Sequence, residues 1–344
     1  MWPMSRKSKP KQFQPLIGDK SIFRQMIDKL LRQFSIDDIF VSTGAQYEQM
    51  ILSELPELPK ENLILEPEMR DTLGAVGYAV MNVYKKFGNT VVATIWGADH
   101  YIRNDEEFIK SLQVAEKIAT QEDLIVNVDA KPTSPNVNLG YMEMGKQIKE
   151  VEGFPIYEFI RQVEKPDLEK AKQFVRSVKF LWHTGYTLFK AELMLDLYRK
   201  HVPDVYAALE KVVSAKDSQF IKEEFARIPK LSIDFGIYEK LEKGKIVEMP
   251  ADLGWSDVGA WNILKDELAE NGKALVIKGD NYDIGSIDCL FYELNESKII
   301  ATIGCENLII VDTPDALLVC PKYKSQEVKK IVEKLKEEGK EKYL

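Results

Sequence analysis

Residues 90–101 read Thr-Val-Val-Ala-Thr-Ile-Trp-Gly-Ala-Asp-His-Tyr. The first seven are all apolar or β-branched, which is typical of a strand that is buried on both faces. Asp99 follows after the small residues Gly97 and Ala98. Ligands of open α/β sheets bind beyond the carboxyl ends of the strands, and Mg²⁺ prefers oxygen donors. The pattern therefore predicts Asp99 as a metal ligand; the alternative is that Asp99 only caps the next segment.

Strand and helix patterns alternate on both sides of this run. Apolar residues recur at helical spacing in some segments and form short β-type runs in others. The expected strands are residues 39–41, 63–65, 90–96 and 124–128, and the expected helices are residues 22–34, 48–52, 75–84 and 105–119. Such alternation predicts a Rossmann-like α/β fold with a mixed, mostly parallel sheet and helices on both faces.

The pattern changes near residue 268. Four short β-type runs are separated by Gly, Asn, Asp and Pro, and a closing helix follows them. The runs are residues 274–277, 299–303, 308–311 and 317–320, and the closing helix carries Val328, Ile331, Val332 and Leu335 on one face. We therefore expect a large α/β domain over residues 1–267 and a small β-rich domain with a terminal helix over residues 268–344.

Composition excludes several classes of protein. The net charge of −8 argues against general nucleic-acid binding, which needs a basic surface. No stretch approaches the ~18 apolar residues of a membrane span. The three cysteines, Cys289, Cys305 and Cys320, form no Cys-x-x-Cys pair, which favours free thiols in a reducing compartment. A cytoplasmic protein that contacts neither nucleic acid nor membrane is the expectation.

Three further segments suggest chemistry. Residues 5–11 hold four cations in seven positions, which suits a polyphosphate or a solvated basic tail. Residues 254–261 read Gly-Trp-Ser-Asp-Val-Gly-Ala-Trp, and Asp257 would complete a two-carboxylate metal site with Asp99 unless the segment is only an aromatic-lined turn. Residues 163–167 contain Glu-Lys-Pro, which offers an acceptor for sugar hydroxyls and a cation for a phosphate, although such strings are common on surfaces.

The order of these segments resembles the mannose-1-phosphate guanylyltransferase (GDP-mannose pyrophosphorylase) family of sugar nucleotidyltransferases. Residues 66–72, Glu-Pro-Glu-Met-Arg-Asp-Thr, are similar to that family's Glu-Pro-x-x-Arg-Asn-Thr, and residues 254–261 are similar to Gly-Trp-Ser-Asp-Val-Gly-Ser-Trp. The other matching segments are residues 2–13, 98–102, 131–135, 163–167, 232–240 and 311–316. The resemblance implies a C-terminal left-handed β-helix-like domain that takes part in forming a homodimer.

The resemblance also implies Mg²⁺-dependent guanylyl transfer from GTP to mannose 1-phosphate. Asp99 and Asp257 would hold Mg²⁺, and Lys11 would bind the triphosphate. Lys165 would hold the sugar 1-phosphate, and Glu164 its hydroxyls. The implied catalytic residues are Lys11, Asp99, Lys165 and Asp257; the nucleotide side is Arg6, Lys11, Glu66, Arg70, Thr72 and Asp99; the sugar side is Gly140, Glu164, Lys165, His183 and Asp234.

The chain departs from the family pattern at three places. The family signature opens with a strand and a Gly-rich loop that would precede Met1, which we interpret as a mis-assigned start or a truncation. Residues 136–142 keep one of two loop glycines, Gly140, and His183 stands where Asn is usual. Harmless drift and an altered sugar, such as a heptose phosphate, both explain the last two departures. A non-catalytic nucleotide-sugar-binding homologue is the alternative of a different class.

Overall fold

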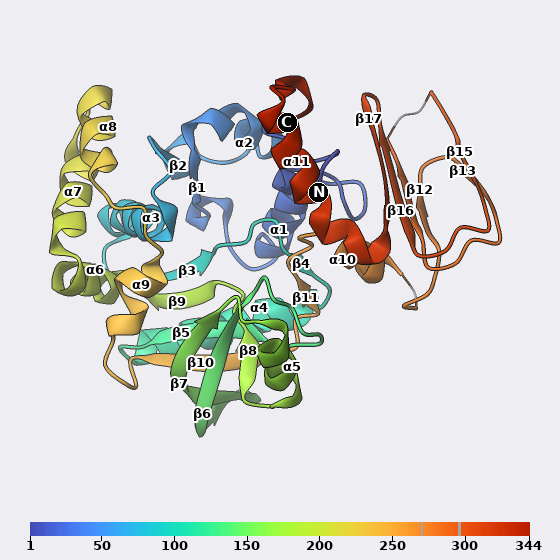
Figure 1. Ribbon diagram of the computed structural model, residues 1–344. Coiled ribbons are helices and arrows are strands. Elements are labelled where there is room, and N and C mark those ends of the chain that lie inside the picture. The colour runs from blue at the N-terminus through green and yellow to red at the C-terminus, as the bar shows by residue number, and fades with distance from the viewer. Residues whose placement is uncertain (270, 295–296) are drawn as a thin grey trace. The chain divides into compact units, whose positions relative to one another are not determined.

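The computed structural model describes residues 1–269, 271–294 and 297–344 (Figure 1). The chain forms two compact units. Unit 1 comprises Met1–Asp28, Ala98–Tyr101 and Ser256–Leu344, and unit 2 comprises Lys29–Gly97 and Ile102–Trp255. The short strands β4 (Tyr101–Ile102) and β11 (Trp255–Ser256) lie at two of the places where the chain passes from one unit to the other.

A seven-stranded sheet forms the centre of unit 2. Its strands follow the order β10-β7-β6-β8-β5-β9-β3, and β10 also pairs with β5. Their bounds are β3 (Val91–Ile95), β5 (Ile125–Ala130), β6 (Gly140–Val151), β7 (Phe154–Glu164), β8 (Phe180–Trp182), β9 (Tyr186–Lys190) and β10 (Ile246–Ala251). Every residue of β5 and β10 is buried, including Asn127 and Asp129 of β5.

The sheet is mixed, as the sequence predicts, but the expectation that it is mostly parallel is wrong. The β5–β10 pairing is parallel, whereas β3–β9, β5–β8, β5–β9, β6–β7, β6–β8 and β7–β10 are antiparallel. A short connection explains one of these pairings, because antiparallel neighbours need no crossover helix. The β6–β7 hairpin turns on Glu152 and Gly153, whose φ angles of 51° and 89° suit a tight two-residue turn.

Helices cover both faces of this sheet, as predicted. Phe189 of β9 belongs to an apolar cluster with α3 and α6, whereas Tyr186 packs against Phe108 of α4 with ring centroids 5.4 Å apart. Residues an odd number of positions apart point to opposite faces of a strand, so these helices lie on opposite sides. The helices of unit 2 are α2 (Glu48–Glu54), α3 (Asp71–Phe87), α4 (Asp105–Gln121), α5 (Leu168–Arg176), α6 (Ala191–His201), α7 (Pro203–Ser214), α8 (Ser218–Ala226) and α9 (Ile233–Gly236).

Strand β3 differs from its prediction. It lies last in the strand order, and its residues are half-buried or exposed rather than buried on both faces. Strands β1 (Val41–Gly44) and β2 (Leu63–Glu66) pair in parallel as a separate two-stranded sheet. In the part of the chain that the structure describes, β3 therefore pairs along one side, with β9.

Unit 1 contains a β-rich region followed by the terminal helix. Strands β12, β14 and β16 pair in parallel one after another, β17 closes this sheet, and β13 pairs with β15. Leu290, Ile309, Val311 and Leu318 fill the core. The elements are α1 (Ile22–Leu30), which begins in this unit, α10 (Trp261–Leu268), β12 (Val276–Lys278), β13 (Asn281–Ile284), β14 (Leu290–Glu293), β15 (Ile300–Ile303), β16 (Leu308–Thr313), β17 (Ala316–Pro321) and α11 (Val328–Glu337).

Among the described residues, no helix is both long and apolar enough to cross a membrane.

Candidate active site

Lys11, Asp99 and Asp257 meet in unit 1. The Lys11 Nζ atom lies 2.7 Å from Asp99 Oδ2 and donates a hydrogen bond of 2.6 Å to the backbone oxygen of Asp257. Burial alone would raise the pKa of Asp99, but the Lys11 ammonium holds this pKa below its ordinary value. Burial raises the pKa of Asp257, and the Asp99 charge raises it further against the opposing effect of Lys11. Three residues from distant parts of the sequence thus form one charged cluster.

The loop after β11 sets the position of the Asp257 carboxylate. Val258 has a φ of 43°, in the left-handed region that side chains rarely adopt. A Cβ on Gly259 would lie 2.7 Å from Asp257 Oδ2, so glycine leaves the room that this carboxylate occupies. Ser256 Oγ accepts a hydrogen bond of 3.3 Å from the Val258 backbone N–H. The segment 256–259 therefore orients the Asp257 side chain.

The donor set of this cluster fits Mg²⁺. Within residues 1–269, 271–294 and 297–344, no group of three or more His, Cys, Asp or Glu side chains gathers as a metal cage. Mg²⁺ does not require such a cage, because one or two carboxylates, waters and substrate phosphates commonly complete its octahedral shell. The two carboxylates Asp99 and Asp257, close enough for the Asp99 charge to raise the pKa of Asp257, match that requirement.

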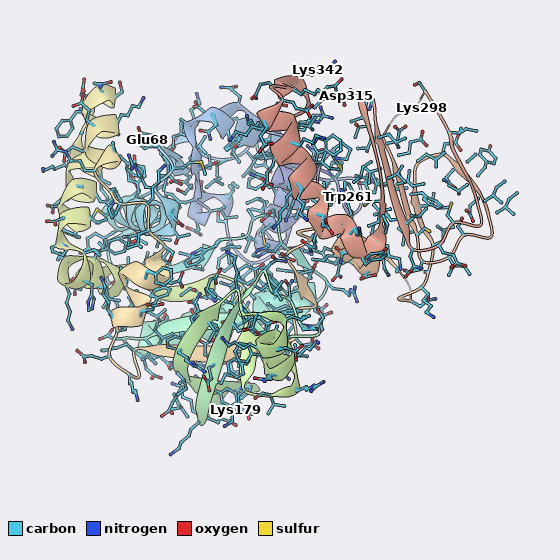
Figure 2. All side chains as sticks on the ribbon, viewed as in Figure 1. Glu68, Lys179, Trp261, Lys298, Asp315 and Lys342 are labelled. Carbon is cyan, nitrogen blue, oxygen red and sulfur yellow. The ribbon has the colours of Figure 1, made fainter. Side chains whose placement is uncertain are left out.

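Arg6, which the resemblance places on the nucleotide side, has other partners. Its Nη1 and Nη2 atoms each donate a hydrogen bond of 2.7 Å to Asp315, and Nη1 also donates to the Lys342 backbone oxygen at 3.2 Å. Figure 2 labels both Asp315 and Lys342, which lie near one another beside the terminal helix α11. Sequence reasoning noted residues 311–316 but gave Asp315 no role.

The predicted sugar-side residues gather at one place in unit 2. Gly140 lies opposite Glu164 in the β6–β7 pairing, and a Cβ on Gly140 would come within 2.7 Å of Glu164 Oε2. The His183 backbone N–H donates to the Gly140 oxygen at 2.9 Å. Lys165 Nζ lies 3.1 Å from Glu164 Oε1. Glycine at position 140 therefore leaves the room that the Glu164 carboxylate occupies.

Asp234 lies near the same residues. It belongs to α9, which begins after the capping residue Ser232, and its Oδ1 atom is buried with no hydrogen-bond partner in the described residues. Burial raises the pKa of Asp234, and the opposing charge of His183 lowers it. A buried acceptor without a partner is uncommon in folded proteins and often marks a functional position.

The remaining nucleotide-side residues also lie in unit 2. Glu66, at the end of β2, accepts a hydrogen bond of 3.2 Å from Ser42 Oγ, and burial raises its pKa. Arg70 donates to Glu68 at 2.6 Å just before α3. Thr72 Oγ1 accepts a hydrogen bond of 2.9 Å from the Ile233 backbone N–H, which ties the start of α3 to the start of α9.

Sequence reasoning missed two fully buried carboxyl groups, that of Asp129 beside His183 and that of Glu248 next to Asp129. Asp129 Oδ1 lies 3.2 Å from His183 Nδ1, and Glu248 stands on the adjacent strand β10. One signal was available, because Asp129 directly follows the expected strand 124–128, as Asp99 follows the run 90–96 after two small residues. Glu248 gave no signal, because one acidic residue within a short apolar run reveals nothing about its neighbours.

Comparisons with known proteins agree along the chain. The family described as Nucleotidyl transferase matches residues 1–273, and the MannoseP isomerase/GMP-like beta-helix domain matches residues 279–335. The mannose-1-phosphate guanylyltransferase of Escherichia coli is 34% identical over 350 residues, covering 100% of this chain and 73% of that protein. The protein of the same name from Salmonella muenchen is 35% identical, covering 98% of this chain and 71% of that protein.

A solved structure is similar over nearly the whole chain. The structure, described as mannose-1-phosphate geranyltransferase from Thermus thermophilus, has a TM-score of 0.87 and 27% sequence identity. The match covers 98% of this chain and 95% of that one.

Proposed function

Because this chain belongs to the mannose-1-phosphate guanylyltransferase family of nucleotidyl transferases, we propose that it transfers a guanylyl group from GTP to mannose 1-phosphate, giving GDP-mannose and pyrophosphate. One observation in particular supports this proposal. The Lys11 ammonium lies within 2.7 Å of both Asp99 Oδ2 and the Asp257 backbone oxygen, so the cation that would bind the triphosphate lies beside the two aspartates that would hold Mg²⁺.

Asp99 and Asp257 would hold Mg²⁺, which when bound neutralises charge on the α-phosphate. Lys11 would bind the triphosphate, with Glu66, Arg70 and Thr72 on the nucleotide side. Because Arg6 is held by Asp315, we assign Arg6 to shaping the N-terminal loop rather than to direct phosphate contact.

Lys165 would bind the sugar phosphate, and Glu164 and Asp234 would accept hydrogen bonds from sugar hydroxyls. An oxygen of the sugar phosphate forms a bond to the α-phosphorus. The bond from that phosphorus to the bridging oxygen breaks in line, and pyrophosphate leaves with its electron pair. Positioning and charge neutralisation supply most of the catalysis in such a reaction, and no nucleophilic side chain is required.

A different sugar 1-phosphate, such as a heptose, is the second candidate substrate. The observation that favours it is His183, which stands where the family pattern has Asn and lies beside the buried Asp129 carboxyl group. We also propose a cytoplasmic homodimer that binds neither nucleic acid nor membrane. The net charge of −8 and the exposed apolar side chains on β13 and β15 support that proposal.

The test measures pyrophosphate release with GTP, Mg²⁺ and a panel of sugar 1-phosphates. Release that depends on mannose 1-phosphate and is lost in Asp257→Asn supports the main proposal. Release with a different sugar alone identifies the second candidate. If no sugar gives release while GDP-mannose still binds in calorimetry, the chain is a nucleotide-sugar-binding homologue and the proposed function is wrong.

A further inference from the structure

His183, Asp129 and Glu248 form a buried row across three elements of unit 2. Asp129 lies on β5, Glu248 on the parallel neighbour β10, and His183 in the connection between β8 and β9. The His183 Nδ1 atom lies 3.2 and 3.4 Å from the two Asp129 oxygens. Glu248 Oε1 accepts a hydrogen bond of 3.0 Å from Asn127 Nδ2. Both carboxyl groups are fully buried.

Two carboxyl groups in this position are not both ionised at neutral pH, because burial and mutual repulsion each disfavour the second charge. Burial raises the pKa of Glu248 well above its ordinary value, and the Asp129 charge raises it further. Asp129 faces more donors than Glu248: the Thr184 backbone N–H at 2.9 Å and the His183 ring nitrogen, against the Asn127 amide at 3.0 Å from Glu248. The negative charge therefore lies on Asp129, and Glu248 is the neutral member.

The Asp129 charge fixes the proton on His183 Nδ1 and favours the imidazolium form. Burial alone would lower the pKa of His183, but Asp129, Asp234 and Glu164 together raise it above the ordinary value. These three carboxyl groups come from β5, α9 and β7. Glu248 of β10 lies next to Asp129. The ring also packs edge-to-face against Trp96, with centroids 5.6 Å apart.

The other nitrogen of the ring points to a ligand. His183 Nε2 is buried and has no hydrogen-bond partner among the described residues, and the same holds for Asp234 Oδ1. A hydroxyl group both donates and accepts, whereas a carboxylate such as that of Glu164 or Asp234 accepts only. An imidazolium N–H supplies the donor that this group of acceptors lacks.

We propose that His183 determines sugar specificity by donating a hydrogen bond from Nε2 to a hydroxyl oxygen of the sugar, and that Asp129 and Glu248 are positioning residues that fix the orientation and charge of its ring. The inference rests on the proposed function, because it concerns the sugar side of that same site. An Asn at this position would offer a neutral amide instead. Affinity for the sugar phosphate is accordingly highest when His183 is charged and falls as the pH rises through its pKa.

The first experiment is NMR on the full chain, whose three histidines are labelled with ¹⁵N. His183→Gln assigns the resonance. We expect His183 to titrate above 6.5, its ordinary value, to lose this elevation in Asp129→Asn, and to shift at Nε2 when mannose 1-phosphate is added. A ring that titrates at or below the ordinary value, or that does not respond to saturating mannose 1-phosphate, overturns the proposal.

The second experiment separates positioning from folding by kinetics. Removing a hydrogen bond from a charged donor weakens binding by roughly 10- to 100-fold, so His183→Gln and Asp129→Asn should raise the KM for the sugar phosphate by that factor and leave the KM for GTP near its original value. Asp129→Asn should also flatten the pH profile of the sugar KM. Glu248→Gln, which keeps a neutral polar side chain, should preserve the sugar KM to within about threefold, whereas Glu248→Val should not.

The outcomes distinguish this inference from the proposed function. If the protein makes GDP-mannose but the His183 resonance does not respond to mannose 1-phosphate, the proposed function is supported and the inference is overturned. A His183 Nε2 shift with mannose 1-phosphate but no pyrophosphate release supports the inference and overturns the function. If Glu248→Gln raises the sugar KM as strongly as Asp129→Asn does, Glu248 carries the charge and the assignment of roles is wrong.

Discussion

Arg6 and Asp315 lie 309 positions apart in the chain, and the two terminal nitrogens of the Arg6 guanidinium each donate a hydrogen bond of 2.7 Å to Asp315. The Arg6 side chain is 12% exposed and that of Asp315 is 45% exposed. Arg6 Nε also donates to the Pro3 oxygen at 2.9 Å, and the Arg6 backbone pairs with Lys9. One guanidinium thus connects the N-terminal loop to the turn between β16 and β17.

We predict that Asp315→Asn raises the KM for GTP by about 3- to 10-fold with little change in Tm. The amide keeps one acceptor but loses the charge and the second hydrogen bond, so the loop that leads to Lys11 is held less firmly. A partly exposed ion pair contributes about 0–1 kcal/mol to stability, which explains the small thermal effect. Steady-state kinetics and calorimetry measure the two quantities.

The matched control is Glu341→Gln, which breaks the Lys7–Glu341 pair of the same region. Both side chains of that pair are mostly exposed, at 69% and 65%, so we expect no change in the KM for GTP. Equal effects of the two substitutions would show that surface charge, and not the Arg6 contact, governs GTP binding.

We predict that Gly259→Ala lowers kcat/KM by about tenfold or more. The added Cβ would lie 2.7 Å from Asp257 Oδ2, so the carboxylate must leave its position, and misplaced catalytic groups lose large factors in rate. The measurement is pyrophosphate release at several Mg²⁺ concentrations. Gly272→Ala is the control, because a Cβ there meets nothing within 4 Å. Unchanged Mg²⁺ dependence in Gly259→Ala would contradict the role of Asp257.

The class of fold could be predicted from the sequence because the pattern of apolar and polar residues depends mainly on which side chains are buried. The run of residues 124–128 predicts a strand, and the structure has the fully buried strand β5 there. The β6–β7 hairpin was missed because much of its outer half faces solvent and its composition is mixed. Strand direction was predicted wrongly because alternation of strands and helices does not show which strands pair.

The positions of the motifs could be predicted from the sequence, because the order of the segments along the chain identifies them. The residues Lys11, Asp99 and Asp257 were chosen from separate segments, and the structure brings them together. Register could not be predicted in this way. Glu248 lies beside Asn127 and close to Asp129 because β10 pairs in parallel with β5, and this depends on the three-dimensional pairing of residues 121 positions apart.

We predict that Ile284→Glu combined with Ile303→Glu converts the proposed dimer to a monomer. The two residues are paired in register on β13 and β15 and are 67% and 76% exposed, and Tyr282 on the same face is 65% exposed. Contiguous exposed apolar side chains commonly mark an interface, and buried charges would oppose association.

Light scattering after size-exclusion chromatography measures the molecular mass of each protein. Val178→Glu, at a residue of unit 2 that is 91% exposed, should leave the mass unchanged; an identical mass for all three proteins would contradict this interface.

We predict that Glu248→Gln stabilises the protein at neutral pH and not at pH 4. The pKa of Glu248 is raised on folding from an ordinary value of 4.5, so folding takes up a proton at any pH between the unfolded and folded values. Stability therefore falls as the pH rises above about 4.5, by up to about 1.4 kcal/mol per pH unit, and continues to fall until the folded pKa is reached. Glutamine is neutral at every pH and escapes this penalty.

Urea unfolding from pH 4 to pH 8 should show a difference in the free energy of unfolding between variant and parent that grows with rising pH. Glu150→Gln, an exposed change on β6, should show a constant difference. A pH-independent gap for Glu248→Gln would mean that Glu248 is ionised in the folded protein, and the neutral partner that fixes the Asp129 charge would be absent.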